Sequence, residues 1–409
     1  MKIAYFCTTF PVLSETFLQR EVNALLEQDN VSLSIYSLWG GHQAWGDAAI
    51  TRISKWKLIA LLWQLPYWTI KNSSAVGVLL KALFKRRPPS WLNFGENLLG
   101  IGLGVFLASK IQKNKPDLLH ATWASMPAAT AWTLSQLLDI PFSMGAHAYD
   151  IFEDGGDWLL REKASEAQFI QTSTDNAARA LQTKLSFAQK KIKLIRRGLN
   201  TLLPLKSLRQ DPSQFHFISI GRLVEKKGYE LQLDIYKAFK EAGIPFKVKI
   251  AGTGPLHQKL QARCKALSLE NCVEFLGAQT QTEIHELYAW ADYMLFTGII
   301  ASNGDRDGLP NVIPEAMAAG VIVLASPGAG TQEAIFHKQT GMLATPQDPQ
   351  LWLAAVKELE STPSLKTALQ RNARLWVEEH FNASVNTKRL CKHFQVAANA
   401  KSKVQELHP

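Results

Sequence analysis

Cysteine is scarce in this sequence, and its four copies are scattered. Cys7, Cys264, Cys272 and Cys391 form no CxxC pair and have no cysteine–histidine spacing typical of metal ligands. This distribution argues against a disulfide framework and a structural zinc site, and it is typical of a reducing compartment. We therefore expect a cytoplasmic protein.

Long apolar runs and low-complexity tracts are also missing. The apolar runs of segment 52–115, such as LIALLWQLPYWTI, are interrupted, here by Gln64 and Pro66. They are shorter than the roughly 20 residues that a membrane-spanning helix needs. The N-terminal MKIAYFCTTF predicts a first strand and not a secretion signal. At 409 residues the chain is long enough for two domains, which is the expected organisation.

Acidic residues are nearly absent from one segment, 52–115. It holds eleven Lys or Arg and a single acid, Glu96, so its net charge equals the +10 of the whole chain. Four tryptophans are interleaved with these cations: Trp56, Trp63, Trp68 and Trp91. Basic residues mixed with Trp and Leu predict helices that lie on an anionic membrane surface, here the inner face of the cytoplasmic membrane. The alternative is a helical insertion whose tryptophans pack on the domain; no nucleic-acid-binding motif accompanies the charge.

Strand and helix patterns alternate along both halves of the chain. Apolar strand-like runs such as KIAYFCT, DLLHATW, FHFISIG and YMLFTG are each followed by a helical pattern. This alternation predicts α/β domains with mostly parallel sheets. We expect a first domain over 1–198 with the basic insertion at about 52–115, a second over 199–380, and a C-terminal helix over 381–409 that returns to the first. Two doubly wound domains of this kind are expected to face each other across a ligand-binding cleft.

Cationic and glycine-rich loops follow two strands of the second domain. In ISIGRLVEKKGYE, Arg222 and Lys227 follow a strand, and their side chains suit a diphosphate. In KIAGTGPLHQKL, Gly252 and Gly254 allow the backbone to approach a ligand closely. The second motif is not GxGxxG, because His257 occupies the last place, so a dinucleotide fingerprint is not predicted.

Two segments of the first domain carry polar residues where a strand is expected to end. His147 in SMGAHAYDIF can donate or accept a hydrogen bond there, although a role confined to its own loop is equally open. Ser14 in TTFPVLSETF lies where the first helix begins, and capping alone explains a serine at that position.

Asp307 and Glu315 bracket a tight turn in DRDGLPNVIPEAMAAG. The turn Gly308-Leu309-Pro310 and Asn311 lead into a helix whose free N–H groups attract phosphate. A carboxylate accepts two hydroxyl donors side by side, which suits sugar hydroxyls for Asp307 and the ribose for Glu315. Each acid alone is explained by a charged loop or a helix N-terminus. Both together with the cationic loop predict a site for a nucleoside diphosphate sugar.

The sequence resembles the retaining glycosyltransferases of the GT-B architecture, in the large bacterial group that includes polysaccharide and colanic-acid-type transferases. The resemblance runs from FPVLSETF through GAHAYDIF, GRLVEKKG and AGTGPL to DGLPNVIPEAMAAG, apart from the basic insertion. The family carries two acids separated by seven residues, usually both Glu; here the first is Asp307. The sequence departs from the family at two further places. It has PVLS where a Gly-Gly pair is common in the N-terminal loop, and GAGTQE replaces the usual Gly-Gly pair before Glu333.

The resemblance implies a role for each residue that matches the motif. Glu315 would bind the donor ribose, Asp307 the transferred sugar, and Arg222 with Lys227 the diphosphate, while His147 would contact the donor sugar. The implied catalytic residues are His147, Arg222, Lys227 and Asp307. The implied donor-binding residues are Ser14, Arg222, Lys227, Gly252, Gly254, Gly308, Leu309, Pro310, Asn311 and Glu315.

No cofactor or metal is expected. Asp305-Arg306-Asp307 spells the DxD signature that binds metal in the other glycosyltransferase architecture, but it lies late in a second domain and not after an early strand of a single domain. Cationic side chains at the diphosphate would make a divalent metal unnecessary.

The expected function is retaining transfer of a hexose-type sugar from a nucleoside diphosphate sugar to a lipid-linked glycan or polysaccharide acceptor, in envelope or exopolysaccharide biosynthesis. Two alternatives stay open. One is a nucleotide-sugar epimerase of the same two-domain shape, and the other is an inactive membrane-associated relative. The base, the sugar, the acceptor, the linkage and the oligomeric state leave no signal in the sequence.

Overall fold

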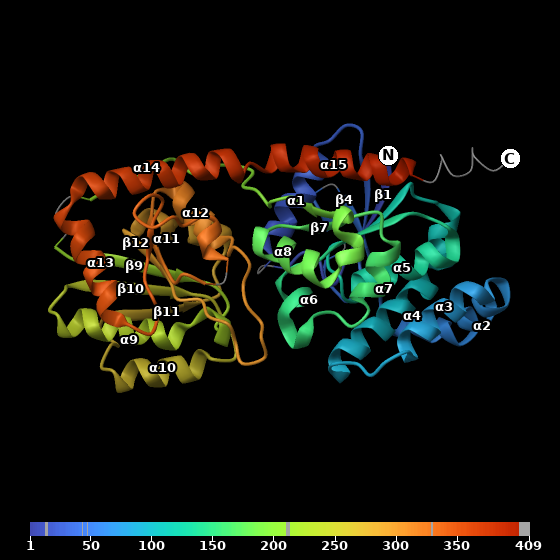
Figure 1. The fold of residues 1–409 in the computed structure, drawn as a ribbon, viewed down its shortest axis with the longest axis horizontal. Helices are drawn as coiled ribbons and strands as arrows, with labels where there is room; N and C mark the ends of the chain where they lie inside the picture. Colours follow the sequence, from blue (N-terminus) through green and yellow to red (C-terminus); the bar gives the residue numbers. More distant parts are fainter. Residues whose placement is uncertain (13–14, 43, 47, 210–212, 329, 401–409) are drawn as a thin grey trace. The chain divides into compact units, whose positions relative to one another are not determined.

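The computed structural model describes residues 1–400 apart from 13–14, 43, 47, 210–212 and 329. The chain forms two compact units (Figure 1). The first consists of Met1–Arg197 and the C-terminal segment from Ala383, and the second is Gly198–Asn382. Each unit is built around a sheet of mostly parallel strands with helices packed against it, so the expected pair of doubly wound α/β domains is confirmed.

The first unit contains a sheet with the strand order β3-β4-β2-β1-β5-β6-β7-β8. Its strands are β1 Lys2–Cys7, β2 Ser32–Ser37, β3 Ala44–Trp45, β4 Ala48–Arg52, β5 Leu118–Ala121, β6 Phe142–Gly145, β7 Ile170–Thr172 and β8 Ile192–Leu194. All pairs are parallel except β3 with β4, a short hairpin that the sequence pattern did not predict. The central strands β1 and β5 are buried from Ile3 and Leu118 onward, because helices cover both faces of a parallel sheet.

The first unit also contains helices, several of which pack against this sheet. They are α1 Thr16–Leu26, η1 Lys55–Ala60, α2 Leu61–Lys71, α3 Ser73–Phe84, α4 Trp91–Lys113, α5 Met126–Leu138, α6 Ala148–Phe152, η2 Glu153–Gly155, α7 Leu160–Glu166, α8 Asp175–Lys184, η3 Ser186–Lys191 and α15 Ala383–Asn399. The basic insertion is thus mainly helical, as expected.

The C-terminal helix α15 belongs to the first unit, which confirms that the chain returns to it (Figure 1). Leu390, Cys391 and Phe394 on this helix are buried in one cluster with residues of β1 and α1. The Phe394 ring packs edge-on against His120 of β5, with 4.9 Å between ring centroids.

Helix α4 is long and apolar, and it packs closely on α5. A Cβ atom at Gly100 would lie 2.5 Å from the Met126 carbonyl oxygen, and one at Gly104 would lie 2.5 Å from the Thr133 Cβ. Glycine at these two positions therefore permits the contact between the helices. Among the described residues, α4 is the helix whose length and composition would suit a membrane span, but half of its apolar window is buried within the unit.

The second unit contains a parallel sheet with the order β11-β10-β9-β12-β13-β14. Its strands are β9 Phe215–Ile220, β10 Phe246–Ala251, β11 Val273–Gly277, β12 Tyr293–Phe296, β13 Ile322–Ala325 and β14 Met342–Leu343. Its helices are η4 Glu225–Lys227, α9 Tyr229–Glu241, α10 His257–Ala266, α11 Gln281–Trp290, α12 Val312–Ala319, η5 Thr331–Glu333, α13 Pro349–Ser361 and α14 Pro363–His380. The two faces of the sheet are covered by separate apolar clusters, one centred on Phe217 and Tyr236 and the other on Met294 and Met317.

Candidate functional site

The strand order of the second unit brings two loops together at one edge of its sheet. From β9 the chain winds outward through β10 to β11, then returns to β12 on the other side of β9 and continues outward. The carboxyl ends of β9 and β12 therefore mark the point where the winding direction reverses, which is where open α/β sheets bind ligands. The loops that follow these strands are 221–228 and 297–311.

Two lysines of the first loop form ion pairs with two acids of the second. The Lys227 Nζ lies 2.6 Å from Asp307 Oδ2, and the Lys226 Nζ lies 2.8 Å from Asp305 Oδ2 and 3.6 Å from Asp307 Oδ1. These side chains are largely buried: Lys226 is 7% and Asp307 14% exposed. The result is a group of two cations and two anions, balanced in formal charge, at the point where the winding reverses.

The lysines keep Asp307 ionised. Burial by itself would raise the pKa of the Asp307 carboxyl, but the ammonium groups of Lys227 and Lys226 more than offset burial and hold that pKa below its ordinary value. Asp307 is therefore an acceptor at neutral pH, and any hydroxyl that binds to it has to share it with Lys227.

Glycines hold the loops of this edge in contact with one another. A Cβ atom at Gly252, where φ is +141°, would lie 1.9 Å from the Gly221 carbonyl oxygen, and one at Gly254 would lie 2.4 Å from the Leu223 carbonyl oxygen. Gly228, at φ +67°, faces the Thr297 carbonyl oxygen in the same way. Gly252 and Gly254 thus have a structural reason to be glycine, namely the packing of one loop on another.

The turn from Gly308 to Asn311 leads into α12 as the sequence predicts. Leu309 is buried, and Gly330 packs directly on the Gly308 carbonyl group, where a Cβ atom would lie 2.5 Å away. Glu315 lies in the first turn of α12 and accepts a hydrogen bond of 3.0 Å from the Tyr288 hydroxyl of α11. The contacts described for Glu315 therefore join it to α11, while those of Asp307 join it to the lysine loop.

Arg222 is placed differently from Lys227. Its guanidinium is exposed, and no residue that the structure describes forms an ion pair with it. The same loop brings Lys226 into the buried group instead. The sequence shows that a second lysine is available, because EKKG places Lys226 next to Lys227. Spacing alone does not say which side chain is buried.

His147 lies at the corresponding edge of the first unit, directly after β6. It is the N-cap of α6, and its backbone N–H donates to Asp150 Oδ2 at 3.2 Å. Its ring packs edge-on against Trp123 at 5.4 Å between centroids, and Ser173 Oγ is 3.4 Å from its Nδ1. Burial, with a smaller contribution from the Arg197 charge, lowers the pKa of His147, so the imidazole is neutral at neutral pH.

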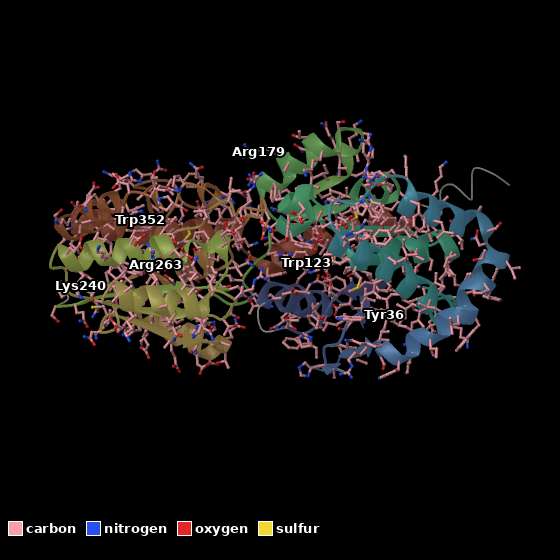
Figure 2. The ribbon with its side chains drawn as sticks, turned by 90° about the horizontal axis from the view of Figure 1, so that it is seen from below. Tyr36, Trp123, Arg179, Lys240, Arg263 and Trp352 are labelled. Atoms are coloured by element: carbon pink, nitrogen blue, oxygen red, sulfur yellow. The ribbon has the colours of Figure 1, made fainter. Side chains whose placement is uncertain are left out.

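An aromatic and cationic group of side chains surrounds this histidine, and sequence analysis missed it. The Arg197 guanidinium lies over the Phe17 ring, 3.4 Å from its centroid, and 5.7 Å from the centroid of Trp123. Trp123, labelled in Figure 2, follows β5, whose neighbour β1 marks the reversal of winding in the sheet of this unit. The signal was available, because Trp123 is the last residue of the predicted strand DLLHATW, at the end of a strand where open α/β sheets bind ligands.

The predicted donor residue Ser14 and the DxD acids remain to be described. Ser14 lies outside the described residues. Asp305 and Asp307, the DxD acids, both contact Lys226, and within the described part of the chain no cluster of three or more His, Cys, Asp or Glu is arranged to hold a metal ion.

A family comparison covers the part of the chain that contains this edge of the second unit. A family model described as glycosyl transferases group 1 matches residues 204–376, a range that contains both loops of the charged group. The second unit therefore contains a glycosyltransferase group 1 domain. The lysine–aspartate group of this glycosyltransferase lies within the matched range.

Relatives and solved structures agree with this assignment. The Escherichia coli K12 protein named colanic acid biosynthesis glycosyltransferase WcaL is 25% identical over 97% of this chain and 100% of its own length. The amylovoran biosynthesis glycosyltransferase AmsK of Erwinia amylovora is 32% identical over 43% of each chain. The structure of Anabaena HepE, solved with UDP and glucose, has a TM-score of 0.70 at 17% identity and covers 97% of this chain and 99% of its own. The fold is thus GT-B, as the resemblance implied.

Proposed function

We propose that this glycosyltransferase moves a hexose-type sugar from a UDP-sugar to a glycan acceptor in exopolysaccharide assembly, with retention at the anomeric carbon. The observation that carries the proposal is the buried group of Lys226, Lys227, Asp305 and Asp307 in the group 1 domain. UDP is chosen because HepE was solved with UDP and with UDP-glucose. The exopolysaccharide pathway is chosen because WcaL and AmsK are named for such pathways.

The proposed chemistry uses these charges. The acceptor oxygen bonds to the anomeric carbon as the bond from that carbon to the diphosphate oxygen breaks, and the acceptor proton passes to the departing diphosphate. Negative charge grows on the diphosphate, and Lys227 and Arg222 stabilise it without a metal ion. Asp307 accepts hydroxyls of the transferred sugar, and Glu315 accepts those of the ribose.

The acceptor is proposed to bind at the edge of the first unit that holds Phe17, Trp123 and Arg197. Flat aromatic rings offer an apolar face to a sugar, and a guanidinium donates hydrogen bonds to hydroxyl or anionic groups. His147, held neutral beside Trp123, is proposed to contact the donor sugar. A lipid-linked glycan is the proposed acceptor class. The cytoplasm is the proposed compartment, since the cysteines are all free thiols.

A panel assay tests the proposal. Purified full-length protein is incubated with UDP-, GDP- and ADP-sugars, and released nucleoside diphosphate is measured alongside changes in the sugar. We expect release of UDP from a UDP-sugar, with the anomeric configuration kept in the product. Conversion of the sugar with no release of UDP would support an epimerase instead, and silence across the panel would contradict the proposal.

Glu315→Gln gives a sharper test of the ribose contact. The amide keeps the size of the side chain and can still accept from Tyr288, but it no longer offers a carboxylate to two hydroxyls. We expect weaker UDP binding and slower turnover. Glu283→Gln is the matched control, because Glu283 lies on α11 in the same unit, where it caps its own helix at Thr280.

A further inference from the structure

Large apolar side chains stand exposed on the helices of the basic insertion. Trp56 is 88% exposed, Ile70 86% and Trp91 81%, values unusual for such residues on a water-facing surface. We call the following set the Trp-rich face: Trp56, Ile59, Leu62, Trp63, Ile70, Leu80, Phe84, Trp91 and Leu92. An exposed apolar surface of this extent marks an interaction site.

The orientation of α2 shows that the exposure is systematic. With about 3.6 residues per turn, Leu62, Trp63 and Ile70 fall on the side of α2 opposite Trp68. Trp68 is buried at 1% exposure and anchors the helix to the unit. The packing alternative for the tryptophans therefore holds for Trp68 and not for the others.

Helix α3 repeats the arrangement beside α2. Val76, Leu79 and Leu83 are buried against the unit, whereas Leu80 and Phe84 point outward. In Figure 2 these helices, drawn in blue, lie along an outer edge of the first unit with their side chains standing away from it. The buried residues fix both helices in place, so the face is presented by a rigid support.

Cations border this face and lack acidic neighbours. Lys57, Lys81 and Lys85 are exposed, and no described residue forms an ion pair with them. Arg86 is different, because it pairs with Glu162 at 2.8 Å. Glu96, the sole acid of segment 52–115, accepts a hydrogen bond from the Tyr149 hydroxyl.

We propose that the Trp-rich face lies on an anionic lipid bilayer. Its tryptophan, leucine and isoleucine side chains would enter the interfacial region, and Lys57, Lys81 and Lys85 would contact lipid phosphates. Helix α4 would lie on the bilayer and not cross it, because its glycine face is packed on α5. This inference does not depend on the donor or the acceptor of the transfer reaction.

Charge complementarity favours a bilayer over other occupants. A second copy of the chain would bring the same unpaired cations face to face, which is repulsive. Nucleic acid would match the cations, but it offers little to aliphatic side chains such as Ile59, Leu62 and Ile70. An anionic bilayer satisfies both features, since it places phosphate charge directly above an apolar layer.

Vesicle flotation of the full chain tests the proposal. Vesicles of phosphatidylcholine alone are compared with vesicles that also contain phosphatidylglycerol. We expect binding to the mixed vesicles that weakens as salt rises, because screening reduces the attraction of surface charges. Failure to bind the mixed vesicles at low salt would overturn the proposal.

Two sets of variants locate the contact. Replacing Trp56, Trp63 and Ile70 by Ser should lower vesicle affinity about tenfold or more, since each buried apolar side chain contributes to partitioning. Replacing Lys57, Lys81 and Lys85 by Gln should lower affinity for the anionic vesicles about a hundredfold, because three cations near the lipid phosphates are lost. The controls are Val385 and Val396 to Ser, and Lys190, Lys388 and Lys392 to Gln, all exposed in the same unit.

The outcomes distinguish bilayer binding from dimer formation and from a defect in the transfer reaction. Unchanged vesicle binding in the variants, or equal losses in the controls, would overturn it. So would a dimer in light scattering that the Trp56, Trp63 and Ile70 variant abolishes, because the face would then belong to a second copy. Release of UDP from the donor, measured without vesicles, should be unaffected by the variants. A defect confined to that reaction would count against the proposed function alone.

Discussion

Lys226 and Lys227 determine what Asp307 can do before a substrate binds. The carboxylate is held between two ammonium groups, one at 2.6 Å and one at 3.6 Å. A diphosphate would compete with Asp307 for Lys227, and a sugar hydroxyl would compete with Lys227 for Asp307. In the proposed function, binding of the donor would replace one set of charged contacts with another, and little net charge would be left unpaired.

Replacing Lys227 by Met should slow turnover about a hundredfold or more, because a charged donor to the leaving diphosphate is lost. The measurement is the rate of UDP release at saturating donor. Lys338→Met is the matched control, since Lys338 belongs to an exposed Lys–Glu pair of the same unit. Equal losses in the two variants would show that charge in general, and not this position, matters.

Asp307→Asn should separate binding from turnover. Lys227 keeps its charge in this variant, so UDP affinity should be preserved or slightly increased. The amide has lost the carboxylate that accepts sugar hydroxyls, so transfer should fall by about tenfold or more. Calorimetry with UDP and a transfer assay measure the two quantities, and a parallel loss in both would contradict the assignment to the sugar.

His120 should make the first unit less stable in mild acid. Burial lowers its pKa to about 3, whereas an unfolded histidine titrates near 6.5, so between these values the unfolded chain binds the additional proton. The free energy of unfolding should therefore fall as pH decreases from 7 to 5, by about 2 kcal/mol from this residue. His120→Asn should reduce that decrease in urea denaturation at the two pH values. Asp150, whose pKa burial raises to about 7, acts in the opposite direction but is present in both proteins.

At the scale of elements, α15 completes the core of the first unit from a distant part of the sequence. Phe394 is fully buried between His120 and Phe169, with ring centroids at 4.9 and 5.8 Å. The helix closes one face of the sheet around β1 and β5, the pair of strands at which the winding reverses. The Phe17, Trp123 and Arg197 group thus depends on a core that the last helix helps to fill.

Phe394→Ala should destabilise the first unit by about 3–5 kcal/mol, the usual effect of emptying a buried phenylalanine site. Val396→Ala on the same helix is the control, because Val396 is 70% exposed and its truncation leaves no cavity. Hydrogen exchange of the β5 amides measures the difference. If both variants protected these amides equally well, α15 would not contribute to the core.

At the scale of the whole molecule, the two units carry different tasks in the proposal. The second holds the charged group proposed for the nucleotide sugar, and the first holds the aromatic edge and the Trp-rich face. A ligand that binds only one unit should therefore slow hydrogen exchange more in that unit than in the other.

UDP should protect the second unit above all. A ligand at one hundred times its dissociation constant stabilises the state that binds it by about 2.7 kcal/mol. Hydrogen exchange should slow in loops 221–228 and 297–311, with much smaller changes in the β6 and β7 strands. The Lys227→Met protein, which should bind UDP poorly, serves as the control. Protection spread evenly over the chain would argue against a nucleotide site in the second unit.

Much of this protein could be predicted from its sequence. The alternation of apolar strands with amphipathic helices is local, so it predicts parallel α/β units, and the turn before α12 is encoded by Gly308, Pro310 and Asn311. Trp56, Trp63 and Trp91 likewise lie in a segment whose charge excess is evident by counting. Such features depend only on near neighbours in the chain, so the order of the residues is enough to predict them.

Only the tertiary structure decided which charged groups meet. Lys226 contacts Asp305 and Asp307 because β9 and β12 are adjacent in the sheet, although dozens of residues separate them in the chain. Local periodicity does not encode strand order, so it could not show that Lys226 is turned inward while Arg222 stays exposed. For the same reason Trp68 could not be told from Trp63: burial depends on what packs against each side of a helix, and that is settled only when the helix meets the rest of its unit.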